Sequence, residues 1–197
     1  MAKAAVAAGH QVSVSAASPE HAASVAEATG ARAAKDNHDA VAGAEVVVLA
    51  VPASVAGEVV AQLGSALDGV TLVDATNPLN ASFSDLAIEG ISAGQDLQAK
   101  APRAHVVKAF NTVFASRYAQ PSENGVKLDA YLAGDDEAAK ARVAEYAASL
   151  GFHPVDAGGL RMARSLEEMA FLNITLNARN NWVWQSGWKL TGPTAAS

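Results

Sequence analysis

The chain has 197 residues, half of them hydrophobic and 17% charged, with a formal net charge of −6 at pH 7. This length suits one domain, or one domain with a small helical appendage, and allows a well-buried core. The negative charge argues against a nucleic-acid surface. The absence of cysteine excludes disulfides, thiolate metal sites and cysteine nucleophiles, and fits a cytoplasmic protein.

Neither a membrane span nor a secretion signal is expected. The longest apolar stretch, residues 46–60, contains Pro52 and Glu58 and is too short to cross a bilayer. No positively charged segment precedes an apolar core near the N-terminus, as a signal peptide requires.

The first forty residues favour short alternating helices and strands. Ser18 followed by Pro19 is typical of a helix start, and Gly30 of a helix end. Residues 10–15 (HQVSVS) alternate apolar and polar side chains, as a strand does. The predicted elements are a helix over 2–8 that ends at Gly9, a strand over 10–15, a helix over 21–29, a strand over 31–34 and a brief helix that ends at Gly43.

Two continuous apolar runs, residues 45–51 (EVVVLAV) and 70–75 (VTLVDA), predict strands buried on both faces of a parallel sheet. A glycine- and serine-rich loop is expected from Pro78 to about Pro102. The other predicted elements are helices over 54–67, 137–150 and 160–179, and strands over 105–110, 130–133 and 154–157. Strands that alternate with helices in this way indicate an α/β fold with a doubly wound parallel sheet.

Ligands of such sheets bind beyond the carboxyl ends of the strands, so the turn after each strand is a candidate site. Each turn also has a purely structural interpretation: a proline that leaves the sheet, an Asn-Pro turn, or a tight glycine turn. The candidate residues are Ser15, Val51, Pro52, Asn77, Pro78, Lys108, Asn111, Thr112, Gly158, Gly159 and Leu160.

Lys108 is the most informative of these residues. A lysine within an otherwise apolar strand needs its charge satisfied or extended to solvent. We expect Lys108 to face the ligand crevice, and the alternative is a lysine that reaches solvent at a strand end. Asn111 and Thr112 add polar groups at the same place.

The long C-terminal helix carries an apolar face, which indicates core packing or a dimer seam. The residues on this face are Met162, Leu166, Met169, Asn173 and Leu176. Residues 182–188 (WVWQSGW) hold all three tryptophans of the chain. We expect this aromatic surface to be covered by the chain itself, a partner subunit or a ligand.

Four motifs occur in a fixed order: residues 46–52 (VVVLAVP), 74–79 (DATNPL), 107–112 (VKAFNT) and 156–160 (DAGGL). In this order they resemble the NADPH-dependent reductases of coenzyme F420 and their bacterial relatives. The resemblance implies a Rossmann-like domain over 1–157, a helical segment over 158–197 and a homodimer. The implied reaction is hydride transfer between NADP(H) and the deazaflavin F420.

The resemblance also implies roles for the candidate residues. Val51, Pro52, Asn77, Pro78 and 108–112 would line the nicotinamide side, and Gly158, Gly159 and Leu160 the deazaflavin side. Ser15 and Ser18 would offer hydroxyls to the adenosine phosphate, and NAD stays open as the cofactor because no arginine accompanies them. No catalytic acid, base or metal is expected, since both reacting carbons belong to coenzymes.

The sequence carries no G-x-G-x-x-G turn before residues 2–8, where that family has its pyrophosphate site. We therefore expect weak NADP(H) binding. We also expect lowered stability from the lack of a central strand between residues 10–15 and 45–51. Two alternatives stay open: a non-catalytic or binding-defective fragment of the fold, and a reductase of another acceptor such as flavin, ferric ion or an imine.

Overall fold

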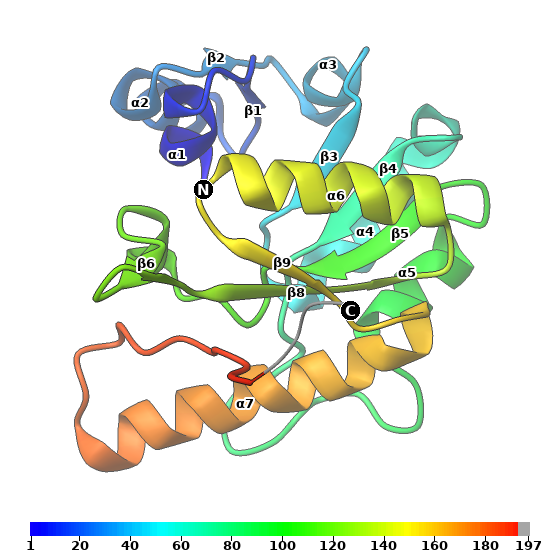
Figure 1. The fold of residues 1–197 in the computed structure, drawn as a ribbon. Helices are drawn as coiled ribbons and strands as arrows, with labels where there is room; N and C mark the ends of the chain where they lie inside the picture. The colour runs from blue at the N-terminus through cyan, green and yellow to red at the C-terminus, as the bar shows by residue number, and fades with distance from the viewer. Residues whose placement is uncertain (193–197) are drawn as a thin grey trace.

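The computed structural model describes residues 1–192 and places a five-stranded sheet at its centre (Figure 1). The strand order is β3-β4-β5-β8-β9. The bounds are β3 Val46–Leu49, β4 Thr71–Asp74, β5 His105–Ala109, β8 Asp129–Gly134 and β9 His153–Asp156. β3, β4 and β5 are parallel, as are β8 and β9, but β8 is antiparallel to β5. The α/β fold is confirmed, and the sheet is mostly rather than wholly parallel.

Helices cover both faces of the sheet, because the strands present apolar side chains alternately to each face. Val73 packs in a cluster that includes residues of α6 (Glu137–Ser149), and Leu72 packs in a second cluster with residues of α4 (Ala53–Leu63) and α5 (Ala93–Lys100). Figure 1 shows α6 in front of the strands and α4 behind them. A short 3-10 helix, η1 (Gly64–Leu67), extends α4.

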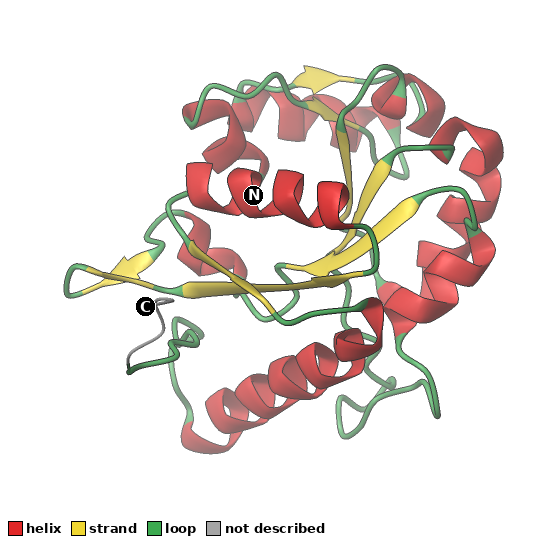
Figure 2. Ribbon diagram, turned by 45° about the vertical axis from the view of Figure 1, so that its right-hand side comes forward, coloured by secondary structure: helices red, strands yellow, loops and turns green. Residues whose placement is uncertain are grey.

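The N-terminal region consists of small elements that pack against the central core through Ala5 and Val41 but have a sheet of their own (Figure 2). β1 (Ser13–Val14) pairs in parallel with β2 (Arg32–Ala33) as a two-stranded sheet. The helices of this region are α1 (Ala2–Ala7), α2 (Pro19–Thr29) and α3 (Asn37–Val41). Ser18 caps α2 through the N–H of His21, and Gly30 ends it in the left-handed conformation, as predicted.

β3 is an edge strand of the central sheet. Within residues 1–192 its only strand partner is β4, and three of its four residues are only partly buried. The expectation of a strand buried on both faces is therefore wrong for β3. It is right for β4, whose four residues are all buried between β3 and β5.

A helix and a two-stranded hairpin lie where the sequence indicated a loop or nothing regular. α5 starts with a capping box, in which Ser92 accepts from Gln95 N–H and the Gln95 side chain accepts from Ser92 N–H. β6 (Ser122–Glu123) and β7 (Val126–Lys127) form a small hairpin. η2 (Ala115–Tyr118) follows β5, and η3 (Leu160–Met162) precedes the last helix.

α7 (Ala163–Asn180) is the last helix and runs below β8 and β9 in Figure 1. Its buried face includes Leu166 and Asn173 of the predicted stripe, together with Ala163, Glu167, Ala170 and Asn177. No helix within residues 1–192 combines the length and apolar character needed to cross a membrane. The division of the chain at residue 157 stays a prediction.

The tail after α7 folds back onto the sheet, so the chain itself covers part of the tryptophan-rich segment. The N–H of Asp129 donates to Trp188 O at 3.0 Å, and Ser116 Oγ donates to Trp184 O at 2.6 Å. The Asp129 carboxylate accepts from Lys189 Nζ at 2.7 Å and from the N–H of Leu190 at 2.6 Å. Trp182 and Trp184 remain nearly half exposed.

Candidate functional site

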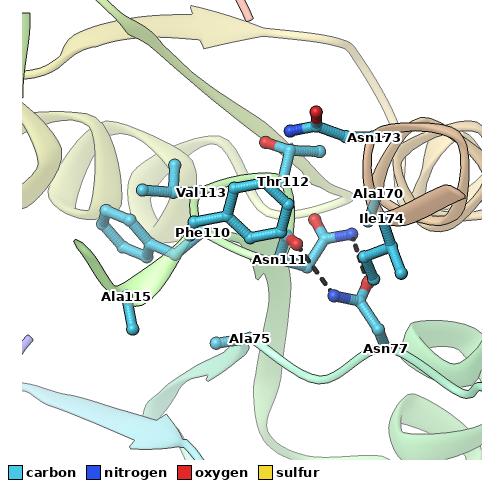
Figure 3. A pocket seen from close by; sticks show the side chains of 11 residues that line it. Ala75, Asn77, Phe110, Asn111, Thr112, Val113, Ala115, Ala170, Asn173 and Ile174 are labelled. Atoms are coloured by element: carbon cyan, nitrogen blue, oxygen red, sulfur yellow. Dashed lines mark hydrogen bonds between the residues drawn. The ribbon is translucent and has the colours of Figure 1, made fainter. Parts of the chain in front are cut away.

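A pocket of about 150 Å³ lies where the chain leaves β4 and β5, against one side of α7 (Figure 3). Its walls are mainly apolar, with three amide side chains and one hydroxyl among them. The lining residues are Ala75, Asn77, Phe110, Asn111, Thr112, Val113, Phe114, Ala115, Ala170, Asn173 and Ile174. A concave, mostly apolar cavity with a few polar groups, at the carboxyl ends of parallel strands, is a typical ligand site of an α/β fold.

The chain enters this pocket through an unusual turn at Phe110. Its φ is +65°, a conformation that costs a non-glycine residue about 1–3 kcal/mol. The ring of Phe110 is buried and packs against Tyr118 and Tyr146, with centroids 6.2 and 5.6 Å away. This packing holds the strained turn, which brings Asn111 and Thr112 to the pocket.

A pair of asparagines joins the turns after β4 and β5. Asn77 Nδ2 donates to the backbone oxygen of Asn111 at 2.8 Å, and Asn111 Nδ2 donates to Asn77 Oδ1 at 3.0 Å. Asn111 Nδ2 also donates to Leu166 O of α7 at 2.9 Å. Figure 3 shows the two bonds between Asn77 and Asn111, which together with the bond to Leu166 tie the two strand turns to α7.

Three residues of the pocket lining each carry a buried side-chain atom with no hydrogen-bond partner, namely Asn111 Oδ1, Thr112 Oγ1 and Asn173 Nδ2. Their residues are 6%, 4% and 5% exposed. Buried polar groups are nearly always paired, and seven such unpaired side-chain atoms occur within residues 1–192. The gathering of three of them around one cavity marks it as a candidate binding site.

A buried ion network lies beneath the pocket. Lys108 Nζ contacts Asp74 Oδ2 at 2.8 Å, Glu167 Oε1 at 3.0 Å and Thr76 O at 2.7 Å. All three charged side chains are fully buried. Glu167 Oε1 also accepts from the N–H of Ala93, so the network joins β4, β5, α5 and α7.

The carboxyl of Glu167 has a raised pKa. Burial is the main cause, because removal from water disfavours the charged carboxylate. The ammonium of Lys108 acts in the opposite direction, while the charge of Asp74 adds to the increase. One cation, Lys108, thus faces the carboxyl groups of Asp74 and Glu167. The Glu167 carboxyl holds its proton more tightly than the carboxyl of an exposed glutamate does.

Three of the predicted site residues, Asn77, Asn111 and Thr112, line this pocket. Lys108 lies below it and has no surface open to a ligand. Its direct contact with a ligand stays a prediction, while its observed contacts are those of a residue that supports the site. Pro78 is buried beside Asn77, and its carbonyl accepts from the N–H of Ala87.

The other predicted residues lie elsewhere. Val51 and Pro52 follow β3 and do not line the pocket. Ser15 Oγ donates to Asn37 Oδ1 at 2.8 Å, and Ser18 Oγ caps α2, so both hydroxyls already have partners in the N-terminal region. Their contacts with a cofactor stay predictions.

The turn at Gly158, Gly159 and Leu160 is set apart by the antiparallel pairing of β5 and β8. Gly158 O accepts from the N–H of Gly134, which is paired with Val107 in the middle of β5 rather than beyond its end. Leu160 is 2% exposed and packs in the cluster of Leu72. This turn therefore lies level with the middle of β5 rather than beyond its carboxyl end, and its ligand contact stays a prediction.

Asn173 is the site residue that the sequence analysis placed elsewhere, on a core or dimer face of the helix. The available signal was an amide within an otherwise apolar stripe, because a buried amide needs partners. The role of Phe110 could not be predicted, because no neighbouring residue in the sequence indicates its positive φ.

The sequence profile of a family described as NADP oxidoreductase, coenzyme F420-dependent, matches residues 1–78. An F420-dependent NADP reductase of Methanothermobacter thermautotrophicus is 33% identical over 163 residues, which cover 79% of this chain and 69% of that protein.

Solved structures agree with this relationship. A protein of Arthrobacter sp. fb24, provisionally named an F420-dependent NADP-reductase, superimposes with a TM-score of 0.83 at 28% identity, over 97% of this chain and 93% of the other. A pyrroline-5-carboxylate reductase of Coxiella burnetii gives 0.61 at 12% identity, over 94% of this chain and 67% of the other. The second similarity concerns the fold alone, which is Rossmann-like.

Proposed function

The chain belongs to the family of F420-dependent NADP reductases, and we propose that it transfers a hydride between NADP(H) and coenzyme F420. The observation that carries this proposal is the pocket after β4 and β5, whose mainly apolar lining includes three residues that each carry an unpaired polar atom. Such a cavity suits a flat, uncharged ring with polar substituents.

The lining of the pocket also suits this chemistry. None of its lining residues is titratable, so the lining supplies no acid or base. Hydride transfer between two coenzymes needs none, because both reacting carbons belong to the coenzymes and the protein contributes position and water exclusion. Asn111 and Thr112 would hold a ring by its polar edge, while Phe110, Val113 and Ala170 would exclude water.

Hydrogen bonds and a buried ion pair hold the rim of the pocket, which supports this proposal. The bonds among Asn77, Asn111 and Leu166 fix the two strand turns against α7. Beneath them, Lys108 and Glu167 hold the same elements together. A preorganised rim limits the range of ring positions, which is the main contribution that a protein can make to a hydride transfer.

An acceptor panel tests the proposal. The purified chain is incubated with NADPH and, in turn, F420, a flavin, ferric ion or a cyclic imine, and oxidation of NADPH is followed by absorbance. We expect NADPH oxidation with F420 that is matched by loss of the absorbance of oxidised F420. Oxidation with another acceptor of the panel but not with F420, or with none of them, would contradict the proposal.

The preference for NADP over NAD is part of the same proposal. It is tested by comparing kcat/KM for NADPH and NADH with F420 as acceptor, and we expect the higher value for NADPH. Equal values would show that the Ser15 and Ser18 hydroxyls do not discriminate the adenosine phosphate.

We also propose a homodimer that uses the apolar surface of α7 and the tail. The exposed side chains there are Leu172, Trp182, Val183 and Trp184, and Phe83 of the loop after β4 lies beside them. Phe83 and Trp184 line a shallow apolar hollow together with Phe171 and Ile174, a kind of surface that protein interfaces commonly use. Sedimentation analysis tests this, and a monomer over the micromolar range would contradict it.

A further inference from the structure

The tail, residues 181–190, contacts two walls of the pocket before it reaches the start of β8. It leaves α7 at Asn181, whose left-handed φ of +54° ends the helix. Figure 1 shows the tail in red as it runs back between α7 and β8. Fixing such a segment costs conformational entropy, so it needs contacts at several points. These contacts fall into two groups, one at the pocket and one at β8.

The first group joins the tail to the wall of the pocket that follows β5. Ser116 Oγ of η2 donates to Trp184 O at 2.6 Å. The rings of Phe114 and Trp184 meet edge to face, with centroids 5.6 Å apart, an arrangement that aromatic pairs favour. Phe114 is itself a lining residue of the pocket. The tail therefore holds this wall both through a backbone oxygen and through a ring.

The tail also holds the α7 wall of the pocket, through Ser186. Ser186 Oγ donates to Asn173 Oδ1 at 2.7 Å and accepts from Asn177 Nδ2 at 2.7 Å. Asn173 lines the pocket, and Asn177 is fully buried. Buried amides without partners are costly. Departure of Ser186 would therefore force both amides to rearrange.

The tail thus bridges two walls that belong to different elements. Trp184 contacts the segment after β5, and two residues later Ser186 contacts α7. Two residues of extended chain reach about 7 Å, so this part of the tail has little slack. The two walls cannot separate here while both contacts stay in place.

The second group of contacts fixes the tail to β8, with the Asp129 carboxylate at its centre. This side chain is 1% exposed and accepts from Lys189 Nζ at 2.7 Å and from the N–H of Leu190 at 2.6 Å. His153 Nδ1 lies 2.8 Å from the same carboxylate. The N–H of Asp129 in turn donates to Trp188 O. We call these contacts of Asp129 with the tail the latch.

Gly187 lies between the pocket contacts and the latch, and it lets the tail approach Leu128, the residue before β8. A Cβ at position 187 would lie 2.6 Å from Leu128 Cδ1, well inside van der Waals contact. Leu128 is buried, so a larger residue would push the tail or the leucine side chain aside. Glycine at this position allows the closed path of the tail.

We propose that the tail is a strap that holds the two walls of the pocket together, and that the latch keeps the strap closed. Trp184 is 45% exposed, so burial alone does little to hold the part of the strap at the pocket. Release of the latch frees Trp184 and Ser186, and the segment after β5 then separates from α7. An ion pair at β8 thereby controls the width of the pocket.

Tryptophan fluorescence of the full chain reports on the strap, because all three tryptophans lie in residues 182–188. Lys189→Met removes the ammonium of the latch and keeps an apolar stem. We expect acrylamide to quench this variant more strongly than the wild type. Lys189→Arg should restore the wild-type quenching, since it renews the ion pair. The control Lys3→Met removes an exposed lysine of α1 and should change nothing.

Hydrogen exchange tests whether the latch acts on the walls of the pocket. In Lys189→Met, amides of residues 113–118 and 172–178 should exchange about fivefold faster, as expected when about one hydrogen bond is lost, while those of β4 stay unchanged. Gly187→Ala should give the same pattern without any change of charge, because its Cβ pushes the tail from Leu128. Unchanged quenching in both variants, or stronger quenching with unchanged exchange at both walls, would overturn the proposal.

The effect on coenzyme binding rests on the proposed function. In the assay with NADPH and F420, Lys189→Met should raise the KM for NADPH about fivefold, and Lys189→Arg should restore it. Faster exchange at the walls in Lys189→Met, without turnover in the wild type, contradicts only the proposed reaction. Turnover in the wild type, with unchanged exchange in Lys189→Met, contradicts only the strap.

Discussion

The N-terminal region, residues 1–41, and the central sheet with α7 use charge in opposite ways. In the first, Arg32 and Asp39 form a surface ion pair with side chains 52% and 29% exposed. In the second, Lys108, Asp74 and Glu167 are fully buried. Surface pairs contribute little to stability, whereas removal of one partner of a buried pair is strongly destabilising.

The same contrast holds for the backbone. β1 and β2 have two residues each and form a sheet of their own, while β4 is paired on both sides and wholly buried. The candidate site lies in the second region, where turns and helix are held by buried bonds. Buried hydrogen bonds and ion pairs are concentrated around the candidate site, and four substitutions test that difference, in order of decreasing expected effect.

Lys108→Met should lower the free energy of unfolding by about 3–5 kcal/mol, because it leaves two carboxyl groups buried without their cation. Urea unfolding followed by circular dichroism measures the change. The control Arg32→Met removes the cation of the exposed pair and should cost less than about 1 kcal/mol. Similar losses in both variants would remove the contrast between the regions.

Asp129→Asn should lower the free energy of unfolding by about 2 kcal/mol, since Asp129 accepts the bonds that anchor the tail at Lys189 and Leu190. Burial raises the pKa of Asp129, but the Leu190 N–H, the Lys189 ammonium and the His153 ring together hold it below 3.8.

The pH dependence of this effect follows from that lowered pKa. A carboxyl whose pKa is lower in the folded state stabilises the fold above its unfolded pKa, and the stabilisation is lost as pH falls through the folded value. The difference between wild type and Asp129→Asn should therefore be full above pH 3.8 and should shrink below it. A difference that grows on acidification would contradict the role of Asp129.

Ser18→Ala should lower the free energy of unfolding by about 1 kcal/mol through loss of the α2 cap. The matched substitution Asp136→Ala removes the cap of α6. In the wild type Asp136 Oδ1 accepts a hydrogen bond from the N–H of Ala139 at 2.8 Å. Hydrogen exchange distinguishes the regions. The first variant should speed exchange only around α2, and a uniform increase over the sheet would show that both regions open together.

Glu167→Gln should have the smallest effect below pH 4.5, where the neutral glutamine amide replaces a protonated carboxyl. Because the folded-state pKa of Glu167 lies above 4.5, the folded protein keeps its proton longer than the unfolded chain. The stabilisation that the Glu167 carboxyl contributes is therefore complete below pH 4.5, and it declines as the pH rises through the pKa of Glu167 in the folded state. The variant should lack that decline. If the free energy of unfolding depended on pH in the same way in the wild type and the variant, that result would contradict the raised pKa of Glu167.

The sequence was most informative where a structure depends on neighbouring residues. Ser18, Pro19 and Gly30 locate α2, and the apolar run at 70–75 locates β4. The sequence was less informative where contacts between distant segments determine the direction or the burial of a strand. The direction of β8 depends on its pairing with β5, and the exposure of β3 depends on which strands flank it.

The candidate site shows the same division. The polar turn at Asn111 and Thr112 was visible because it follows an apolar strand, and Lys108 was visible as a charge in need of compensation. Its partner Asp74 lies 34 residues earlier, and Glu167 lies on a helix whose docking no local pattern encodes. Asn173 reaches the pocket through that same docking.

The central claim is that the pocket between the β5 turn and α7 holds a reacting ring. A crystal structure of the chain with NADP+ and F420 tests it most directly. We expect a coenzyme ring against Asn111, Thr112 and Asn173, with a hydrogen bond to at least one of their three unpaired atoms. Both rings bound elsewhere, with this pocket free of either, would contradict the account.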